Sequence, residues 1–312
     1  LSRKIFKVGF LISESTTKQH NFNMKKRILI TGGNGQLGNC LKKIAPDYEL
    51  NYDFRFTDSS DLDITDEAAV FDFFEEYKPH YCINAAAYTA VDLAEKEEEM
   101  AFSVNADAVA FLAEASKKLK TTFIHVSTDY VFDGETEISY SEDDFTQPSG
   151  VYGASKLKGE ILAIELNPES IIVRTSWLYS EFNKNFVKTM LNLFSQKEEL
   201  SVVADQFGQP TNANDLAEAL MKIISNENKT YGIFHFSNYP ETTWYEFASK
   251  IAEFSKSKVK INPISTDQFP TAAKRPRRST MDLSKIEEKY NLEIKHWEQS
   301  LEECIGILNN SK

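Results

Sequence analysis

The clearest hydrophobic pattern in the chain is an apolar run that leads straight into a glycine-rich turn. The run is Ile28–Ile30, the turn is Thr31–Gly38 (TGGNGQLG), and Leu41 and Ile44 then follow at helical spacing. An apolar strand, a tight turn and an amphipathic helix in this order are typical of the start of a βαβ unit. We therefore predict a strand, a turn and a helix here, with the helix ending near Ile44 because Pro46 follows.

Strand and helix patterns alternate through the first half of the chain. The expected strands are 54–57, 80–85, 122–127 and 171–174, and the expected helices are 68–77, 104–118 and 152–166. The strand at 80–85, the third along the chain, is apolar, which is typical of a central position in a parallel sheet. Alternation at this spacing predicts an α/β fold with a doubly wound parallel sheet, the Rossmann architecture.

The alternation becomes less regular after Arg174. We expect helices at 185–194, 215–224 and 244–254, and strands at 200–203 and 232–236. Residues 24–170 are predicted to form the Rossmann domain. Residues 171–312 are predicted to form mainly a smaller domain, partly interleaved with the first because segments at about 200–225 return to it. We interpret residues 1–23 as a polar N-terminal extension, since the apolar stretch Val8–Ile12 is too short for a signal peptide.

Composition narrows the classes of partner. The chain has 312 residues, with 47 acidic and 35 basic side chains and a formal net charge of −12. Proteins that bind a nucleic-acid backbone need a basic surface, so we expect no nucleic-acid partner. No apolar stretch of the sequence approaches the length of a membrane span, and the three cysteines have no CxxC spacing. These features predict a cytoplasmic protein without a membrane anchor.

The glycine-rich turn is suited to bind a pyrophosphate. Glycines let the backbone turn tightly, leave room for an anion against bare amides, and let the helix pack closely on the strand. The anion then meets the unpaired N–H groups of the helix N-terminus. Asp58, at the end of the second expected strand, can bind the ribose hydroxyls. An ordinary glycine-rich turn is the alternative, but the surrounding pattern favours a dinucleotide site.

Candidate catalytic residues follow the fourth expected strand. Tyr152 and Lys156 are one helical turn apart and therefore share a helix face. A nearby ammonium would pull the pKa of the tyrosine from about 10 toward neutrality, so that Tyr152 could protonate a carbonyl oxygen that receives hydride. Thr128, at the strand end, can donate a hydrogen bond to the same oxygen. The alternatives are a surface pair for Tyr152 and Lys156, and a plain core role for His125 within the strand.

Two other stretches of the sequence can each be interpreted either as plain structure or as part of a binding site. Ala85–Ala87, after the third strand, permits close approach of a cofactor or begins an alanine-rich helix. Lys274–Arg278 has four cations in five residues. Such a run is either a solvated loop or, beside a nucleotide site, a contact for a substrate diphosphate.

Five further motifs make a resemblance specific. They are Asn84–Asp92, Ser127–Phe132, Arg174–Trp177, Asp205–Thr211 and Arg275-Pro276. With the glycine-rich turn, and in this order from Met24 to near the C-terminus, they resemble the extended short-chain dehydrogenases/reductases, and within them the dTDP-4-dehydrorhamnose reductases. The resemblance implies reduction of dTDP-4-dehydro-6-deoxy-L-mannose to dTDP-L-rhamnose, a nucleotide sugar for polysaccharide synthesis, with hydride from NADH or NADPH. Asp58 disfavours a 2′-phosphate by its charge, so NADH is favoured.

The same resemblance implies roles for individual residues. Tyr152 would be the proton donor, Lys156 would lower its pKa and hold the nicotinamide ribose, and Thr128 would bind the carbonyl oxygen of the sugar. The other expected substrate contacts are Asp129, Tyr130, Trp177 and Arg275. The other expected cofactor contacts are Gly32, Gly35, Gln36, Leu37, Gly38, Asp58, Asp63, Ala87, Tyr88, Thr89 and Val126.

Two other functions remain open at this point. Sugar-nucleotide dehydratases and epimerases are the nearest enzymes, but the dehydratases follow Thr-Asp with a glutamate, where this chain has Tyr130. A relative that serves as a regulatory subunit of methionine adenosyltransferase binds a partner instead of catalysing. Some relatives dimerise around magnesium through acidic residues, one of them at the position of Asn39. We therefore expect no metal site, while a homodimer stays compatible with the resemblance.

Overall fold

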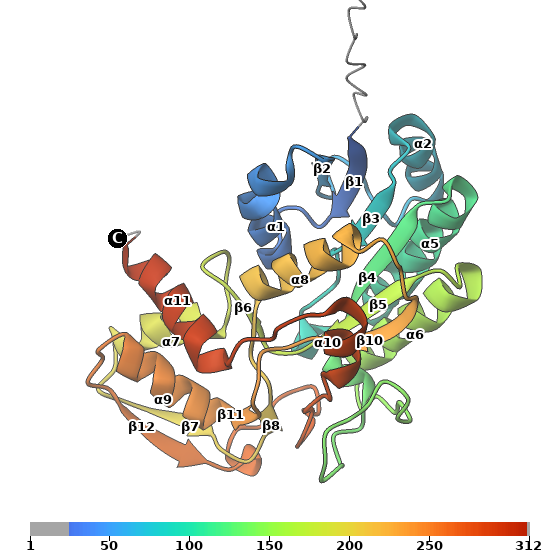
Figure 1. The fold of residues 1–312 in the computed structure, drawn as a ribbon. Helices are drawn as coiled ribbons and strands as arrows, with labels where there is room; N and C mark the ends of the chain where they lie inside the picture. The colour runs from blue at the N-terminus through green and yellow to red at the C-terminus, as the bar shows by residue number, and fades with distance from the viewer. Residues whose placement is uncertain (1–24, 311–312) are drawn as a thin grey trace, which may run out of the picture.

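A computed structural model describes residues 25–310 of the chain. The predicted extension at residues 1–23, and Met24 after it, lie outside the described residues. The remainder forms a large parallel sheet with helices on both faces and a smaller lobe beside one end of it (Figure 1). Within the described residues, no helix has the length and apolar character needed to span a membrane.

The large sheet has six parallel strands in the order β10-β5-β4-β3-β1-β2. Their bounds are β1 Lys26–Thr31, β2 Tyr52–Thr57, β3 Tyr81–Asn84, β4 Thr122–Thr128, β5 Ile171–Thr175 and β10 Gly232–His235. Every residue of β3 and β5 is buried, as strands covered on both faces must be. The predicted doubly wound parallel sheet is confirmed.

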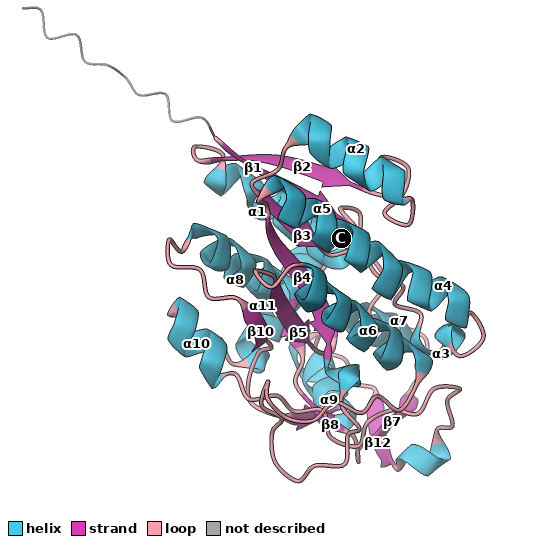
Figure 2. Cartoon of the chain, turned by 90° about the vertical axis from the view of Figure 1, so that its right-hand side faces the viewer, coloured by secondary structure: helices cyan, strands magenta, loops and turns pink. Residues whose placement is uncertain are grey.

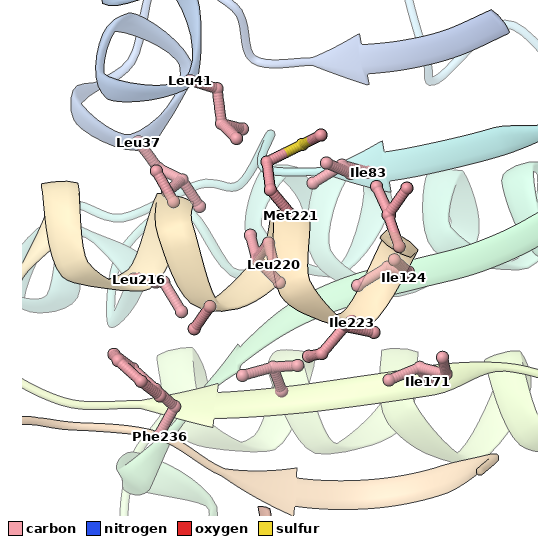
Figure 3. Packing of buried hydrophobic residues seen from close by; sticks show 14 of the residues in the cluster. Leu37, Leu41, Ile83, Ile124, Ile171, Leu216, Leu220, Met221, Ile223 and Phe236 are labelled. Atoms are coloured by element: carbon pink, nitrogen blue, oxygen red, sulfur yellow. The ribbon is translucent and has the colours of Figure 1, made fainter. Parts of the chain in front are cut away.

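Helices cover both faces of this sheet (Figure 2). One face carries α1 (Gln36–Tyr48), α8 (Ala213–Ser225) and α10 (Ser284–Tyr290), and the other carries α2 (Glu67–Tyr77), α5 (Ala108–Leu119) and α6 (Val151–Leu166). Met221 of α8 lies between Leu41 of α1 and Ile83 of β3, and Leu220 belongs to the same buried cluster (Figure 3). The helix thus joins a late segment of the chain to the first βαβ unit.

Helix α1 continues past Pro46, so our prediction that it ends near Ile44 was wrong. A proline removes one backbone donor, and its ring disturbs the preceding turn. Pro46 lies in the last turn, so little helix follows the disturbed hydrogen bond. The apolar face of Leu37, Leu41 and Ile44 is buried against the sheet, and this packing keeps the final turn helical.

The smaller lobe has its own core. Its helices are α7 (Phe186–Phe194), α9 (Trp244–Phe254) and α11 (Trp297–Asn310), and its longest strands, β7 (Glu199–Val203) and β12 (Lys260–Ile264), pair in parallel. Apolar side chains of these elements form one buried cluster. Of the segment at about 200–225, α8 packs on the large sheet, whereas Leu200–Val203 belongs to β7 in the smaller lobe. The domain boundaries drawn from the sequence stay a prediction.

Short elements complete the chain and shape its loops. They are α3 Val91–Ala94, α4 Glu98–Phe102, a π-helix at Ser103–Asp107, 3₁₀-helices at Asp129–Val131 and Thr266–Gln268, and the two-residue strands β6 Leu178–Tyr179, β8 Phe207–Gly208, β9 Thr211–Asn212 and β11 Thr242–Thr243. The expected helix at 104–118 is therefore divided, since a π-helix precedes α5. π-Helical turns often occur at functional sites, and this one faces α6.

Candidate active site

A cavity of about 780 Å³ lies at the carboxyl edge of the large sheet. Thr31 at the end of β1, Ala85 after β3, Thr128 at the end of β4 and Thr175 at the end of β5 all line it. Residues on the side of the cavity that faces the smaller lobe, including Trp177, form the opposite wall. Open α/β sheets bind ligands at this edge, so the cavity is the candidate active site.

The glycine-rich turn forms one wall of the cavity, and its glycines have different tasks. Gly32 has φ +67°, and a Cβ on it would come within 2.6 Å of the Ala86 backbone nitrogen. A Cβ on Gly38 would lie 2.5 Å from the Gly32 carbonyl oxygen. Gly32 and Gly35 line the cavity, but Gly38 does not; it permits α1 to pack closely on the turn. Gly38 was expected to contact the cofactor, but the structure places it outside the cavity lining, where it serves helix packing.

Asp58 lies at the rim, where the turn meets the end of β2. Its carboxylate accepts hydrogen bonds from the Ser60 hydroxyl at 2.6 Å and the Ser60 amide at 2.8 Å, and from the Asn34 side chain. The Ser60 hydrogen bonds hold the pKa of Asp58 below its ordinary value. The Lys42 ammonium donates to the same Asn34 at 2.8 Å. Asp58 is therefore a fixed anion at the expected ribose position, and the cation Lys42 is connected to it through Asn34.

The start of α6 brings the candidate catalytic residues into the cavity. Tyr152 and Lys156 both line it, and the Tyr152 ring lies edge-on to Tyr130 with centroids 5.6 Å apart. Lys156 is 1% exposed and its ammonium nitrogen donates to the Val126 carbonyl at 2.7 Å. Burial lowers the pKa of Lys156 to about 8, although the Glu160 charge acts in the opposite direction. Lys156 is thus buried at the cavity floor with the half-buried Tyr152 beside it, and a surface pair is excluded.

The pKa of Tyr152 differs from the sequence-based expectation. Burial raises it above the ordinary value of 10, the Thr128 hydrogen bond opposes this, and the charges of Asp129 and Tyr130 raise it further. Lys156 was expected to pull the pKa toward neutrality, but burial acts the other way and dominates, and the Lys156 nitrogen donates to the Val126 carbonyl. Tyr152 is consequently a protonated phenol at neutral pH, which suits a proton donor.

Thr128 and Asp129 form a buried pair beside the phenol. The Thr128 hydroxyl donates to an Asp129 oxygen at 3.0 Å and accepts from the Tyr130 amide at 3.2 Å. Among residues 25–310, no donor makes a hydrogen bond of ordinary length to the second Asp129 oxygen. Burial raises the pKa of Asp129 to about 6, while the Ser279 and Thr128 hydroxyls act against this rise. A buried carboxylate with a free oxygen in a cavity wall is a candidate for holding a substrate hydroxyl.

The substrate side of the cavity is only partly as expected. Trp177 lines the cavity and stacks on Trp244, with centroids 3.6 Å apart. Arg275 does not line the cavity; its guanidinium donates to the Tyr130 hydroxyl at 3.2 Å and to Asp92 at 3.0 Å. The other cations of the Lys274–Arg278 cluster pair with Glu135, Glu137 and Glu241. These four cations therefore form ion pairs with side chains of the chain itself.

Most other predicted cofactor contacts line the cavity. They are Gln36, Leu37, Asp63, Ala87, Thr89 and Val126. Tyr88 does not, because its hydroxyl points to Glu97 at 2.7 Å. Its backbone is held instead by Asn105 of the π-helix, whose amide accepts from the Tyr88 N–H at 2.8 Å and donates to the Tyr88 carbonyl.

Sequence reasoning missed two groups of site residues. Asn105 also donates to the Ser155 hydroxyl at 3.0 Å, and so ties the segment at Tyr88 to α6. Residues 183–185 line the cavity, and the Asn185 side chain donates to Gln36 at 2.9 Å. The π-helix has no sequence pattern of its own, and the loop at 183–185 meets the glycine-rich turn only through the tertiary fold. Neither group had a signal that could have revealed it.

The position of Asn39 bears on the question of metal. Its side chain donates to the carbonyls of Asn34 at 3.0 Å and Gly35 at 2.8 Å. Across residues 25–310, no group of three or more His, Cys, Asp or Glu side chains is arranged to hold a metal ion. Asn39 thus stabilises the glycine-rich turn by direct hydrogen bonds.

Comparison with known proteins now adds to this geometry. The family model of the RmlD substrate-binding domain matches residues 25–310. A dTDP-4-dehydrorhamnose reductase from Aggregatibacter actinomycetemcomitans is 45% identical over 287 residues, which cover 88% of this chain and 97% of the relative. The chain belongs to the dTDP-4-dehydrorhamnose reductase family. It is accordingly an oxidoreductase of the extended short-chain dehydrogenase/reductase type, as the motifs predicted.

Solved structures of this reductase family have the same fold. The dTDP-4-dehydrorhamnose reductase from Clostridium acetobutylicum has a TM-score of 0.87 at 42% identity, covering 91% of this chain and 99% of that one. The reductase from Bacillus anthracis, solved in complex with NADP, has a TM-score of 0.86 at 41% identity, covering 90% and 99%. The similarity extends across both the Rossmann sheet and the smaller lobe.

Proposed function

We propose that the protein reduces the 4-keto group of dTDP-4-dehydro-6-deoxy-L-mannose to give dTDP-L-rhamnose, using NADH or NADPH. The observation that carries this proposal is the position of Tyr152, a half-buried and protonated phenol, in one cavity with the glycine-rich turn. The names of the relatives that match nearly the whole chain support the choice of substrate.

The dinucleotide fits the residues that are present. Gly32, with its positive φ and no room for a Cβ, provides the bare backbone that a pyrophosphate approaches. The N-terminus of α1 then faces the anion, Asp58 would bind the adenosine ribose, and Lys156 the nicotinamide ribose. The bound nicotinamide supplies the hydride for C4 of the sugar.

The residues of the chain supply the proton. Tyr152 donates its phenolic proton to the sugar oxygen as the carbonyl is reduced, which leaves a phenolate on Tyr152. Thr128 turns its hydroxyl proton from Asp129 to the same oxygen and stabilises the charge that develops there. Asp129, with one oxygen already free, holds a hydroxyl of the sugar. Trp177 covers the sugar from the opposite wall.

The preferred cofactor follows from the charges at the rim. Asp58 is an anion held in place by Ser60 and Asn34, and it would repel a 2′-phosphate. Lys42 offsets part of this charge through Asn34. We therefore propose that both cofactors bind and that NADH is preferred, although the relative from Bacillus anthracis was solved with NADP.

The experiment is a panel of nucleotide 4-keto sugars with NADH and NADPH, read by loss of nicotinamide absorbance and by the stereochemistry of the product. Oxidation of the cofactor with formation of the L-rhamnose configuration supports the proposal. Cofactor-neutral conversion of the sugar would indicate an epimerase or dehydratase instead. No absorbance loss at high enzyme concentration, with cofactor binding intact, would point to a binding subunit.

The location and the assembly of the protein are proposals as well. Cys40, Cys82 and Cys304 are all free and buried, as thiols in a reducing compartment are, and we propose the cytoplasm. A homodimer also stays a proposal, and light scattering of the purified protein tests it.

A further inference from the structure

His125 lies beneath the cavity between two polar side chains. Its Nδ1 is 3.0 Å from the amide nitrogen of Asn84, and its Nε2 is 3.2 Å from the side-chain nitrogen of Lys156. The ring is fully buried and parallel to Phe123. No water-exposed face is available to it, so the neighbouring side chains decide which ring nitrogen carries the proton.

The orientation of the Asn84 amide is fixed from its other side. The Asn84 oxygen accepts from the Ala86 backbone N–H at 3.2 Å and from the Thr31 hydroxyl at 2.6 Å. A backbone N–H can only donate, so the amide oxygen must face Ala86. The amide nitrogen, which can only donate, must then face His125.

The proton position on His125 follows from this. Because Asn84 donates to Nδ1, that nitrogen is unprotonated and accepts. Burial, together with the charge of Lys156, lowers the pKa of His125 well below its ordinary value, so the ring is neutral and carries its single proton on Nε2. This Nε2–H is directed at the nitrogen of Lys156.

A donor directed at Lys156 has unequal effects on the two forms of the lysine. The ammonium has only donors, so its N–H groups oppose the Nε2–H of His125. The neutral amine has a lone pair that accepts from Nε2–H and can still donate to the Val126 carbonyl. If Lys156 becomes an ammonium, its N–H group faces the Nε2–H of His125, and two donors point at each other. The alternative is that the proton of His125 moves to Nδ1, which breaks the hydrogen bond from Asn84.

We infer that His125 is a positioning residue which, held by Asn84 in the Nε2–H tautomer, disfavours the ammonium form of Lys156 and lets this lysine exchange its proton near neutral pH. The inference rests on the proposed function, in which Lys156 serves Tyr152. During reduction Tyr152 loses its proton to the sugar oxygen. A proton then passes from Lys156 to the phenolate: the Tyr152 O–H bond forms, a Lys156 N–H bond breaks, and solvent returns the proton to the amine.

The charged groups around Lys156 act on it through their charge, whereas His125 acts through the direction of its N–H donor. Glu160, on the same helix, favours the ammonium, but its carboxylate is engaged by Arg174 of β5. Asp129, from the 3₁₀-helix after β4, acts on the pKa of Tyr152 and has no resolved effect on Lys156. Burial acts in the same direction as His125.

The first test uses the unaltered protein and needs no substrate. Nitrogen NMR of histidine-labelled protein at pH 7.5 distinguishes a protonated from an unprotonated ring nitrogen. We expect one slowly exchanging histidine with Nε2 protonated and Nδ1 bare, and H125Q should abolish its signals. A protonated Nδ1, or a charged ring, on this histidine would overturn the inference.

The second test measures the lysine directly. In protein labelled at lysine Cε, the resonance absent from K156R reports the titration of Lys156. In H125Q the side-chain amide can turn its oxygen to the lysine, so the midpoint should rise by a unit or more, a tenfold or larger gain in proton affinity. The matched control is H80Q, the same change at an exposed histidine that accepts from the Arg27 amide. An unchanged midpoint in H125Q would overturn the inference.

A third variant changes only the Asn84 side chain, which holds the proton of His125 on Nε2. In N84D a carboxylate faces Nδ1 and requires a proton there, so the histidine pattern should invert and the Lys156 midpoint should rise. If N84D raises the Lys156 midpoint equally in the H125Q background, the added charge alone explains the rise. The idea that Asn84 acts by fixing the tautomer of His125 is then refuted. These readouts are independent of turnover, so failure of the keto-sugar assay would count against the proposed substrate only.

Discussion

Glu160 and Arg174 form a fully buried ion pair that joins helix α6 to strand β5. The Arg174 Nε lies 3.0 Å from Oε1 of Glu160, a terminal nitrogen lies 2.7 Å from Oε2, and both side chains are 2% exposed. The guanidinium also lies 5.0 Å from the ring centroid of Phe132. Glu160 follows Lys156 by one helical turn, so the pair fixes the helix that carries Tyr152 and Lys156 against the sheet.

Removing one partner of this pair should destabilise the protein strongly. We expect E160Q to lower the free energy of unfolding by about 3–5 kcal/mol, because Arg174 keeps a buried charge without its counter-ion. Urea unfolding measures the change. E165Q, at an exposed position of the same helix, should change it by less than about 0.5 kcal/mol. A loss in E160Q as small as that in E165Q would show that the pair is not essential to the fold.

Replacing the proposed proton donor should separate binding from chemistry. Y152F keeps the ring and its contact with Tyr130 but has no proton to give, so kcat should fall by about 10²–10⁴-fold. The dissociation constant of the cofactor, measured by fluorescence quenching, should stay within about threefold. Y48F, at a tyrosine of α1 that bonds Glu218, should keep full activity. A kcat close to that of the unaltered protein would remove Tyr152 from this role.

Asp129 should make the stability of the protein depend on pH. Burial raises its pKa from 3.8 to about 6, so between these values the folded state binds more protons than the unfolded state. Stability therefore falls as the pH rises through this window, and the cost, on the order of 3 kcal/mol, is complete above about pH 6. D129N removes the charge and should be more stable than the unaltered protein at pH 7.5, with a smaller gain at pH 5.

Urea unfolding at the two pH values tests this expectation. D53N, at an exposed aspartate of β2, is the matched control and should show no pH-dependent gain. An equal effect of D129N at both pH values would mean that the buried carboxyl does not titrate in this window.

Cofactor preference should respond to the charge of Asp58. D58A removes the anion that opposes a 2′-phosphate and leaves Lys42 nearby. The ratio of kcat/KM for NADPH to that for NADH should rise by about five- to tenfold, the scale for one exposed charge acting over a few Å. Initial rates with the two cofactors measure it, and the effect should weaken in high salt. If the ratio does not change, another residue selects the cofactor.

Much of the site was accessible from spacing along the chain. The glycine-rich turn, the acid after the second strand and the Tyr–Lys spacing each depend on local geometry, and residues 32, 58, 152 and 156 do meet in one cavity. Arg275 and Tyr88 did not follow their motifs into the cavity wall, because each side chain found a closer partner, Asp92 and Glu97 respectively. A motif fixes where a backbone segment lies but not how a long side chain competes for partners.

The sequence alone determined the order of strands and helices in the first half of the chain, the place of the glycine-rich turn and the face that Tyr152 shares with Lys156. These features depend on hydrophobic periodicity and on backbone conformations that few residues allow. Only the tertiary structure decided the electrostatics: the raised pKa of Tyr152, the position of His125 beside Lys156, and the pairing of Glu160 with Arg174. Burial and contacts between residues distant in the chain set these properties, and neither is encoded in a local pattern.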